Sequence, residues 1–452
     1  MRRSAKVLHF PFAGLTRSLS VRDNTQPSET RTYGTPLALN VRGSCTFEDR
    51  HRGGSRPGLA VVEGIAADGS GRWLWPNGEP ILWPGGAAIV YADPFAGYHA
   101  PDGARFLDPH AGIRIAASEG AAPANPSLVT FYRARAFAAE GTQWYCSATG
   151  DAGNWDYGGD RENVARAVSG NIALAGRRGE GITAFMAVDD ARLYMATKRS
   201  LWVMSEPTAA LKKVSDTVGC VSANAWCVAD GTLYTLSPQG LYMVAPDAAP
   251  LRVDAEIPES LRGASTALLA FDPEENAIHV FSDKGDFFYE IEEKAFWPVA
   301  MPSTSRPTVA ARCVLGGVDR LLLLGGDGIW RRFSSEAAPE DSYVAIGPFR
   351  TSGRDDEDGI LDTLHIVLAD GSDDVALEIY PARTAEAALL KCADGVLAAA
   401  APAFTATVGE GFNHTIRPRV RGAWCVIVLR GTSGRWAYET ATANCKSLGR
   451  LR

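Results

Sequence analysis

The sequence lacks any apolar run long enough to cross a membrane. A bilayer-spanning helix needs about 18 or more consecutive apolar residues, and no such run occurs in the 452-residue chain. The N-terminus is basic, Met1-Arg2-Arg3, but Lys6 and Pro11 interrupt the residues that follow, so the apolar core of a secretory signal does not form. We therefore expect neither a signal peptide nor membrane insertion.

Motifs for catalysis and metal binding are also missing. Only seven histidines occur, and no two of them stand four residues apart, the spacing of a helical zinc site. Phosphate-loop, dinucleotide-binding and GxSxG patterns are absent. Carboxylate pairs for glycosidic bond cleavage can be drawn in any acidic chain, but the sequence does not place them at a working separation. We expect a protein that is not an enzyme and holds neither a cofactor nor a metal.

Cysteines are few and scattered. The eight cysteines, at positions 45, 146, 220, 227, 313, 392, 425 and 445, include no CxxC pair. In a long chain without a secretory signal, such cysteines are more often reduced and buried than bridged. We therefore expect free thiols.

Composition and charge indicate a globular chain with basic ends. Hydrophobic residues make up 46 % of the sequence and charged residues 21 %, as in soluble globular proteins. The 46 glycines and 26 prolines favour many turns and all-β structure. The net charge of −7 is uneven, because residues 1–60 carry +6, residues 413–452 carry +7 and residues 61–412 carry −20. Basic ends favour contact with nucleic acid or with an acidic protein surface; solvated tails are the alternative.

A two-strand phrase recurs between about residues 182 and 335. Each copy contains an apolar strand, a tight turn and a strand with an aromatic residue, and the copies begin at Leu193, Leu233, Ile278 and Leu321. The steps of 40, 45 and 43 residues match the period of a β-propeller blade. Stacked sheets of this kind bury one another's faces. We therefore predict an all-β fold, with a β-propeller of about five to seven blades in residues 127–340.

Four aromatic residues occupy repeated strand positions: Trp202, Tyr242, Tyr289 and Trp330. A repeated position favours packing between sheets over stacking on carbohydrate. The loop Asp151 to Asp156 is rich in Asp, Asn and Gly, which favours a tight turn anchored by Trp155. An EF-hand calcium loop does not fit, because no Glu closes the ligand set.

The segment before the repeat is predicted to be an extended arm over residues 1–60, because Pro, Gly and polar residues alternate with isolated apolar ones. Within it, Arg50, Arg52 and Arg56 stand among glycines. Gly53-Gly54 would let the backbone approach a partner closely, and arginine forks bind carboxylates or phosphates. A surface turn is the alternative.

Two further regions complete the chain. Residues 61–126 hold short aromatic runs and a hairpin signal at Asn77-Gly78, so we predict an irregular β region or an extra blade. Residues 341–452 return to alternating apolar patterns and are predicted to form a β-sandwich-like domain, in which the alanine-rich stretch 383–403 fits either a short helix or a strand pair. The arginines of 415–421 alternate, so in a strand they would project from one face, which favours contact with a partner.

Segments at both ends resemble a known family. Residues 9–15 (HFPFAGL), 35–42 (TPLALNVR) and 52–58 (RGGSRPG) resemble the N-terminal signature of the tail nozzle or tail hub (tail tubular) proteins of short-tailed bacteriophages. Residues 417–422 (RPRVRG) and 435–439 (RWAYE) are similar to a late β-domain of related virion proteins. The resemblance implies a virion structural protein, six copies of which form a ring below the portal and adaptor. The ring would continue the DNA ejection channel, and its propellers would hold fibres or spikes.

The resemblance also implies partners and a location. The partners are other copies in a six-fold ring, the tail adaptor or portal protein, a tail fibre or spike, and viral DNA in transit; the location is the virion tail, after assembly in the host cytoplasm. An acidic body suits a DNA conduit, because a basic lining would bind phosphates tightly. Residues 61–126 depart from the family pattern and leave the blade number open. The candidate assembly contacts are Arg42, Arg50, Arg52, Arg56, Arg417, Arg419 and Arg421.

A second hypothesis belongs to another functional class. A carbohydrate-binding or glycan-hydrolysing β-propeller would place its sugar site at the loop Asp151 to Asp156. Because the propeller fold hosts enzymes, lectins and scaffolds alike, the fold does not decide between the two hypotheses.

Overall fold

The computed structural model describes residues 3–16, 34–43, 52–62 and most of 97–450. Within 97–450, the residues not described are 101–102, 109–111, 116–118, 122, 124–125, 152, 161, 173–179, 206–210, 256, 258, 316, 328, 353–356, 399, 413–414 and 433. Arg50 and the hairpin predicted at Asn77-Gly78 lie outside the described residues. Nearly all regular structure in the described part is antiparallel β-sheet, with one helix, α1 (Ala385–Ala398). The all-β prediction is confirmed.

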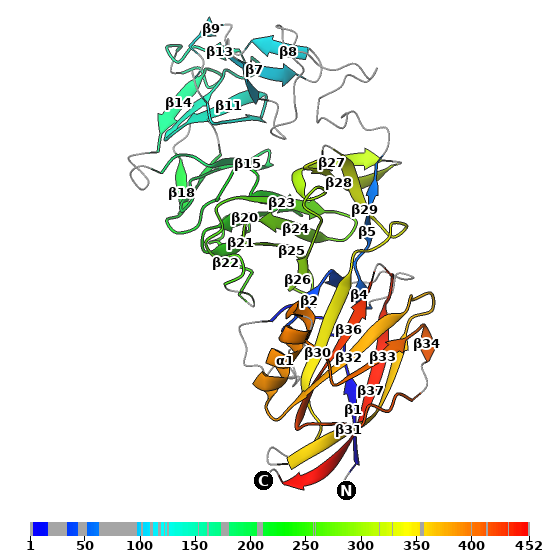
Figure 1. Ribbon diagram of the computed structural model, residues 1–452. Coiled ribbons are helices and arrows are strands. Elements are labelled where there is room, and N and C mark those ends of the chain that lie inside the picture. Colours follow the sequence, from blue (N-terminus) through cyan, green and yellow to red (C-terminus); the bar gives the residue numbers. More distant parts are fainter. Residues whose placement is uncertain are drawn as a thin grey trace.

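Five four-stranded antiparallel sheets follow one another along the chain (Figure 1). The first sheet contains β10 (Leu128–Tyr132), β11 (Arg135–Glu140), β12 (Gln143–Cys146) and β14 (Val168–Asn171). The second contains β15 (Ala184–Asp189), β16 (Arg192–Ala196), β17 (Leu201–Met204) and β18 (Lys212–Ser215). The third contains β19 (Trp226–Ala229), β20 (Thr232–Ser237), β21 (Gly240–Val244) and β22 (Leu251–Arg252). The fourth contains β23 (Ala267–Asp272), β24 (Ala277–Ser282), β25 (Gly285–Glu290) and β26 (Ala295–Val299). The fifth contains β27 (Pro307–Leu315), β28 (Val318–Gly325), β29 (Trp330–Ser334) and β5 (Gly58–Val61).

The recurring sequence phrase forms the two middle strands of the second to fifth sheets. In the third sheet, for example, Leu233 pairs with Val244 and Leu236 with Leu241. The turn residue Gly240 has a φ of 135°, in the region that favours glycine, and its hydrogen leaves room for the carboxylate of Asp254. The strand pairs predicted from the repeat are thus confirmed.

Neighbouring sheets of this series pack through their first strands and through apolar side chains. β10 contacts β15, β15 contacts β19, β19 contacts β23, and β23 contacts β27. The ring centroids of Phe137 in the first sheet and Phe185 in the second are 6.1 Å apart, and those of Tyr234 and Tyr289, in the third and fourth, are 6.4 Å apart. Apolar packing therefore continues from one sheet to the next.

Three smaller sheets also form. β6 (Gly97–Ala100), β7 (Gly103–Asp108) and β8 (Gly112–Ile115) form a three-stranded sheet. β9 (Glu119–Gly120) pairs in parallel with β13 (Asn154–Trp155), and β3 (Val41–Arg42) pairs with β4 (Gly54–Ser55).

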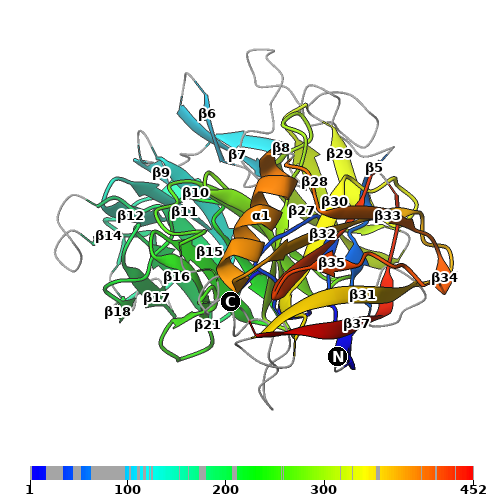
Figure 2. The same cartoon turned by 60° about the horizontal axis from the view of Figure 1, so that its bottom comes forward.

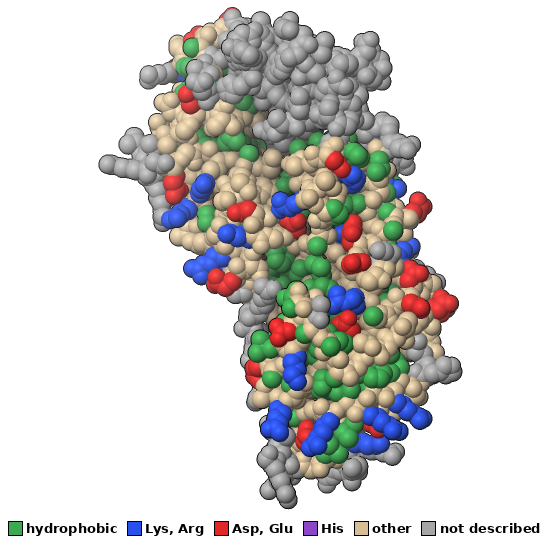
Figure 3. All heavy atoms as spheres, in the orientation of Figure 1, with side chains coloured by type: hydrophobic (Ala, Val, Ile, Leu, Met, Phe, Trp, Pro, Cys, Tyr) green, Lys and Arg blue, Asp and Glu red, His purple; other side chains and the backbone are tan. Residues whose placement is uncertain are grey.

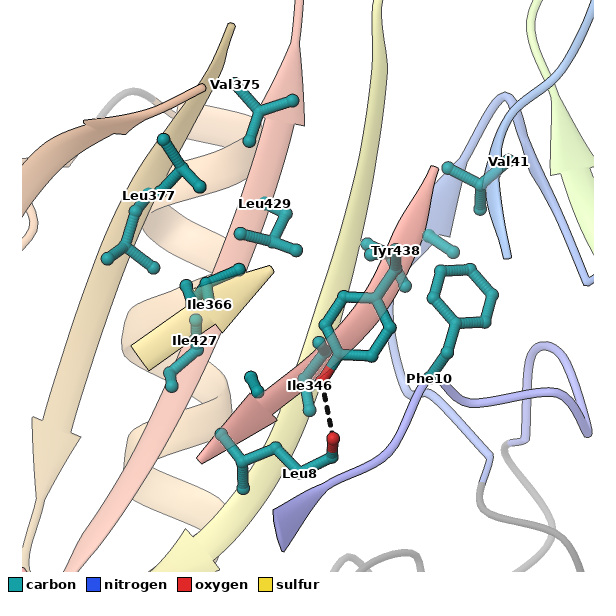
Figure 4. Packing of buried hydrophobic residues seen from close by; sticks show 14 of the residues in the cluster. Leu8, Phe10, Val41, Ile346, Ile366, Val375, Leu377, Ile427, Leu429 and Tyr438 are labelled. Carbon is teal, nitrogen blue, oxygen red and sulfur yellow. Dashed lines mark hydrogen bonds between the residues drawn. The ribbon is translucent and has the colours of Figure 1, made fainter. Parts of the chain in front are cut away.

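The rest of the chain forms two five-stranded sheets that share one core, here called the two-sheet unit. One sheet contains, in order, β2 (Ala38–Leu39), β30 (Ser342–Arg350), β36 (Trp424–Gly431), β32 (Val375–Ala382) and β33 (Phe404–Val408). The other contains β1 (Arg3–Leu8), β37 (Tyr438–Arg450), β31 (Glu357–Leu368) and β34 (Gly411–Phe412), with β35 (Val420–Arg421) also on β31. Inward residues of both sheets, such as Ile346, Ile427 and Ile366, meet in this core (Figure 4).

Helix α1 covers the outer face of the first of these sheets (Figure 2). The hydroxyl of Thr384 accepts a hydrogen bond from the N–H of Ala387 at 3.1 Å, as an N-cap does. Ala385, Ala388, Cys392 and Gly395 are buried at helical spacing. Of the two alternatives for residues 383–403, the helix is therefore the one that forms.

The N-terminal arm is threaded into the sheets of its own chain. β1 pairs with β37, β2 with β30, and β5 with β29. The first and last strands thus lie side by side at the end of the two-sheet unit away from the four-stranded sheets (Figure 1). Among the described residues, no helix has the length and apolar character that membrane crossing requires.

Candidate assembly interface

Arg42 lies inside the chain, at the junction between the fourth sheet and the two-sheet unit. Its side chain is 2 % exposed, and its Nη1 lies 2.7 Å from Oε1 of Glu275, which is 25 % exposed. The guanidinium also stacks on two rings, with Cζ 4.1 Å from the centroid of Phe288 and 5.0 Å from that of Phe333. Arg42 therefore fastens the arm to the fourth and fifth sheets.

Arg56 lies beside Arg42 and is also buried. Its Nε donates a hydrogen bond to Oδ1 of Asn40 at 3.0 Å, and its Nη2 donates to the carbonyl of Ala300 at 3.0 Å. Burial lowers the pKa of Arg56 to about 10, and the positive charge of Arg42 adds to this shift. The expectation that Arg42 and Arg56 face another molecule is wrong, because both side chains are buried against described residues of their own chain.

A buried histidine and aspartate stand next to these arginines. Nε2 of His279 lies 3.6 Å from Oδ2 of Asp272, and both side chains are buried. The imidazole stacks on Phe333, with centroids 4.6 Å apart and an interplanar angle of 9°. Burial lowers the pKa of His279; Asp272 opposes this shift and Arg42 adds to it. No motif in the sequence marks this pair, because Asp272 and His279 lie on two neighbouring strands, β23 and β24, and come together only when these strands pair.

Gly53 and Gly54 make the close backbone approach that the sequence predicts, but the surface approached belongs to the same chain. A Cβ at Gly53 would lie 2.0 Å from ring atoms of Phe10, and one at Gly54 would lie 2.1 Å from the carbonyl oxygen of Trp436. The neighbouring Arg52 pairs with Glu439, Nη2 to Oε1 2.5 Å. This part of the arm therefore binds the start of β37.

The three C-terminal arginines remain at the surface. Arg417, Arg419 and Arg421 are exposed, while Ile416, Pro418 and Val420 between them are less so. The predicted strand is only partly formed, because Arg419 has a φ of 51° and regular pairing is limited to β35 and a bridge from Ile416 to Leu364. Nε of Arg421 lies 2.8 Å from Oδ2 of Asp358. All three arginine side chains thus remain accessible, and that of Arg421 is 71 % exposed despite its ion pair.

The two basic ends of the sequence meet in space, because β1 and β37 are neighbours. Lys and Arg side chains gather at this end of the two-sheet unit (Figure 3). Nζ of Lys446 pairs with Oδ2 of Asp362 at 2.6 Å. Burial lowers the pKa of Lys6, and the positive charge of Arg350 adds to this shift, while Cys445 opposes it. We use the name basic end for the surface that carries Lys6, Lys446, Arg417, Arg419 and Arg421.

The loop Asp151 to Asp156 is held by side-chain hydrogen bonds in its turns and by the buried Trp155. Carboxylate and amide oxygens of Asp151 and Asn154 accept the backbone N–H groups of Gly153 and Asp156, at 2.9 and 3.0 Å. Trp155 is 0 % exposed and packs on β11. The turn anchored by Trp155 is confirmed, and the buried indole offers no face to a sugar ring.

Arg135 holds the segment that follows this loop. Its guanidinium donates to the carbonyls of Ser147 at 3.0 Å, Arg166 at 2.8 Å and Val164 at 2.5 Å. Residues 164–166 are thereby tied to the first sheet. In the described part of the chain, no group of three or more acidic, histidine or cysteine side chains is arranged to hold a metal ion.

Of the four aromatic residues at repeated positions, three are buried as predicted: Trp202, Tyr289 and Trp330. Tyr242 differs, because it is half-buried and lines a surface groove with Lys213 and Pro250. The six cysteines whose side chains the structure describes are buried free thiols. Burial raises the pKa of Cys220 to about 11, so this thiol is unreactive at neutral pH.

Comparisons with known proteins assign no family. No family model matches the chain, and no curated protein matches it. Among solved structures, the extracellular domain of a one component system from B. thetaiotaomicron is 11 % identical over 63 % of this chain and 38 % of that one, with a TM-score of 0.36. The AfRom2 CNH domain is 11 % identical over 64 % of this chain and 95 % of that one, with a TM-score of 0.34. YCF48 bound to a D1 peptide is 12 % identical over 68 % and 94 %, with a TM-score of 0.32. Similarities at this level carry no argument about function.

Proposed function

We propose that this chain is a structural subunit of the tail nozzle or hub of a short-tailed bacteriophage, and that six copies form a ring below the portal and adaptor. The observation that carries the proposal is the position of the segment that resembles this family. Its stretches 35–42 and 52–58 contain β2, β3 and β4 and lead into β5. Arg42 and Arg56 hold these stretches where the fourth and fifth sheets meet the two-sheet unit. A segment that contacts both parts determines how the four-stranded sheets of a subunit are joined to its two-sheet unit.

We further propose that the five four-stranded sheets are blades of a β-propeller. The repeat period of 40 to 45 residues supports this architecture, as do the successive contacts between first strands. A pocket of about 290 Å³ is lined by the first strands of the third, fourth and fifth sheets, as a central propeller channel would be. In this arrangement the propeller projects from the ring and holds fibres or spikes.

The contact between subunits would be electrostatic and head to tail. The basic end of one copy would face an acidic groove of about 540 Å³ on the next, lined by Asp373, Asp374 and Glu410. Two different patches on one subunit make a heterologous contact, which closes into a ring when the rotation allows. Charge complementarity also makes such assembly sensitive to salt.

Native mass spectrometry of the purified chain at low salt, with and without a portal and adaptor complex, tests this proposal. We expect rings of six, and we expect the triple variant Arg417→Gln, Arg419→Gln, Arg421→Gln to remain monomeric while keeping its unfolding midpoint. Arg383→Gln, at another exposed position, is the matched control and should still assemble. A wild-type chain that stays monomeric alone and with the portal and adaptor complex contradicts the proposal.

The location requires a separate measurement. Immunogold labelling of particles from a culture that produces this chain should mark the tail, below the portal. Purified particles that contain none of the chain would refute a virion location.

A further inference from the structure

The pocket between the first strands has mostly apolar walls. Trp226 from β19, Leu268, Ala270 and Phe271 from β23, and Ala310 from β27 line it. Each of these three strands is the terminal strand of its sheet, so one backbone edge of each is left unpaired by that sheet. A volume of about 290 Å³ is at the lower end of the range for small-molecule sites. The pocket therefore suits one ring system and not an extended ligand.

One charged side chain, Arg312, lines the same pocket. Its Cζ lies 5.6 Å from the centroid of Phe271, so the cation and this aromatic wall are adjacent. Arg312 forms an ion pair with Asp319 through Nη2, and the two side chains are 48 % and 40 % exposed. Because a guanidinium carries five N–H groups, a pairing through Nη2 alone leaves donors for a second anion.

We propose that this pocket binds a planar aromatic group that carries a carboxylate, with the ring against Trp226 and Phe271 and the carboxylate on Arg312. Aromatic walls favour an aromatic ligand through edge-to-face and offset contacts. A carboxylate on a guanidinium forms charge-assisted hydrogen bonds, which a neutral ring lacks. The same chemistry occurs in a free aromatic acid and in an aromatic residue at the C-terminus of a peptide. This inference does not depend on the proposed tail function.

Two small probes and one peptide test the site. Binding of indole and of indole-3-acetate to the full chain is measured by ligand-observed NMR and by titration calorimetry. A peptide that ends in a free C-terminal tryptophan is compared with its amidated form. We expect indole-3-acetate to bind about tenfold more tightly than indole, the effect of one charge-assisted hydrogen bond. Tighter binding of the free-acid peptide than of indole-3-acetate would identify a peptide terminus as the source.

Filling and charge variants locate the binding. Ala310→Leu and Ala270→Leu each place a larger side chain in the pocket and should abolish binding, while Ala398→Leu on the exposed end of α1 is the matched control. Arg312→Gln should remove the preference for the carboxylate and leave indole binding unchanged. Unfolding midpoints of all variants distinguish loss of the site from loss of the fold, and a filled pocket should unfold no earlier than the wild type. Absence of binding by both small probes, or binding that survives both filling variants, overturns the proposal.

Discussion

The ion pair of Arg42 and Glu275 gives the sharpest test of how the arm is fastened. The Arg42 side chain is 2 % exposed and that of Glu275 is 25 % exposed. Removing one partner of a buried pair costs roughly 3–5 kcal/mol, because the other charge is left uncompensated. Glu275 keeps contact with water, so the lower end of that range applies, and loss of the contacts to Phe288 and Phe333 adds about 1 kcal/mol. Arg42→Ala should therefore lower the free energy of unfolding by about 4 kcal/mol.

The replacement series separates charge from packing. Among the described residues, Nε and Nη2 of Arg42 have no hydrogen-bond acceptor. The folded state therefore bears the cost of keeping these N–H groups away from water, and a replacement without N–H donors removes that cost. Arg42→Met keeps an apolar stem against both rings but leaves Glu275 unpaired, so it should cost about 3 kcal/mol, about 1 kcal/mol less than Arg42→Ala. The double variant Arg42→Met, Glu275→Gln should return close to wild type, since apolar replacements of buried pairs are often neutral.

Urea unfolding, followed by tryptophan fluorescence and by far-UV circular dichroism, measures these differences. The two signals also show whether the two-sheet unit and the four-stranded sheets unfold together. Arg417→Ala removes an exposed arginine and should change stability by less than about 0.5 kcal/mol. An Arg42→Ala variant as stable as Arg417→Ala would refute a structural role for the buried pair.

Three further outcomes are expected. Burial lowers the pKa of His279 below its ordinary value of 6.5, so the unfolded state binds the proton more readily than the folded state, and stability falls as the pH drops below 6.5. His279→Gln should therefore flatten the profile of unfolding free energy between pH 7 and 5. An unchanged slope would contradict this. Gly54→Ala should destabilise by at least about 2 kcal/mol because of its contact with the Trp436 carbonyl. Gly159→Ala is the control and should be neutral in the same urea assay, because a Cβ there would make only ordinary contacts, 3.8 Å from Cβ of Arg166 and 4.0 Å from the carbonyl of Asp156. Trp155→Ala should cost about 3–5 kcal/mol as a core truncation, and loss of glycan binding without loss of stability would instead favour a sugar site at its loop.

The local pattern of the chain was readable from the sequence, and its long-range contacts were not. Period-2 alternation and glycine turns predicted the hairpins that contain Leu233 and Ile278, because each strand of a meander pairs with the next strand in the sequence. The arm of residues 1–60 has no such periodicity, and its partners lie hundreds of residues away. The family resemblance implied that the arm wraps a neighbouring copy, whereas β1, β2 and β5 pair with strands of their own chain.

The candidate contacts divide for the same reason. Arg417, Arg419 and Arg421 alternate with apolar residues, and the exposure expected from that pattern is observed. Arg42 and Arg56 stand among turn residues, where arginine is usually exposed. Their burial is explained by groups that lie far away in the sequence, namely the rings of Phe288 and Phe333 and the carboxylate of Glu275. The adjacent Gly53-Gly54 indicated a close backbone approach, which the structure shows, but a glycine pair does not specify which surface is approached.

The pairing of early strands with late ones has a consequence for synthesis of the chain. β1, β2 and β5 leave the ribosome first, but their partners β37, β30 and β29 are among the last segments made. At about 5–20 residues per second, β1 waits roughly 20–90 s for β37, and β5 roughly 15–55 s for β29. The second, third and fourth sheets consist of consecutive strands and can form as these strands emerge. In the fifth sheet and the two-sheet unit, strand edges stay unpaired until the late partner strands are made. Closure of the two-sheet unit thus depends on the 13-residue strand β37, which pairs with both β1 and β31. A chain that stops short of β37 would present unpaired strand edges for aggregation.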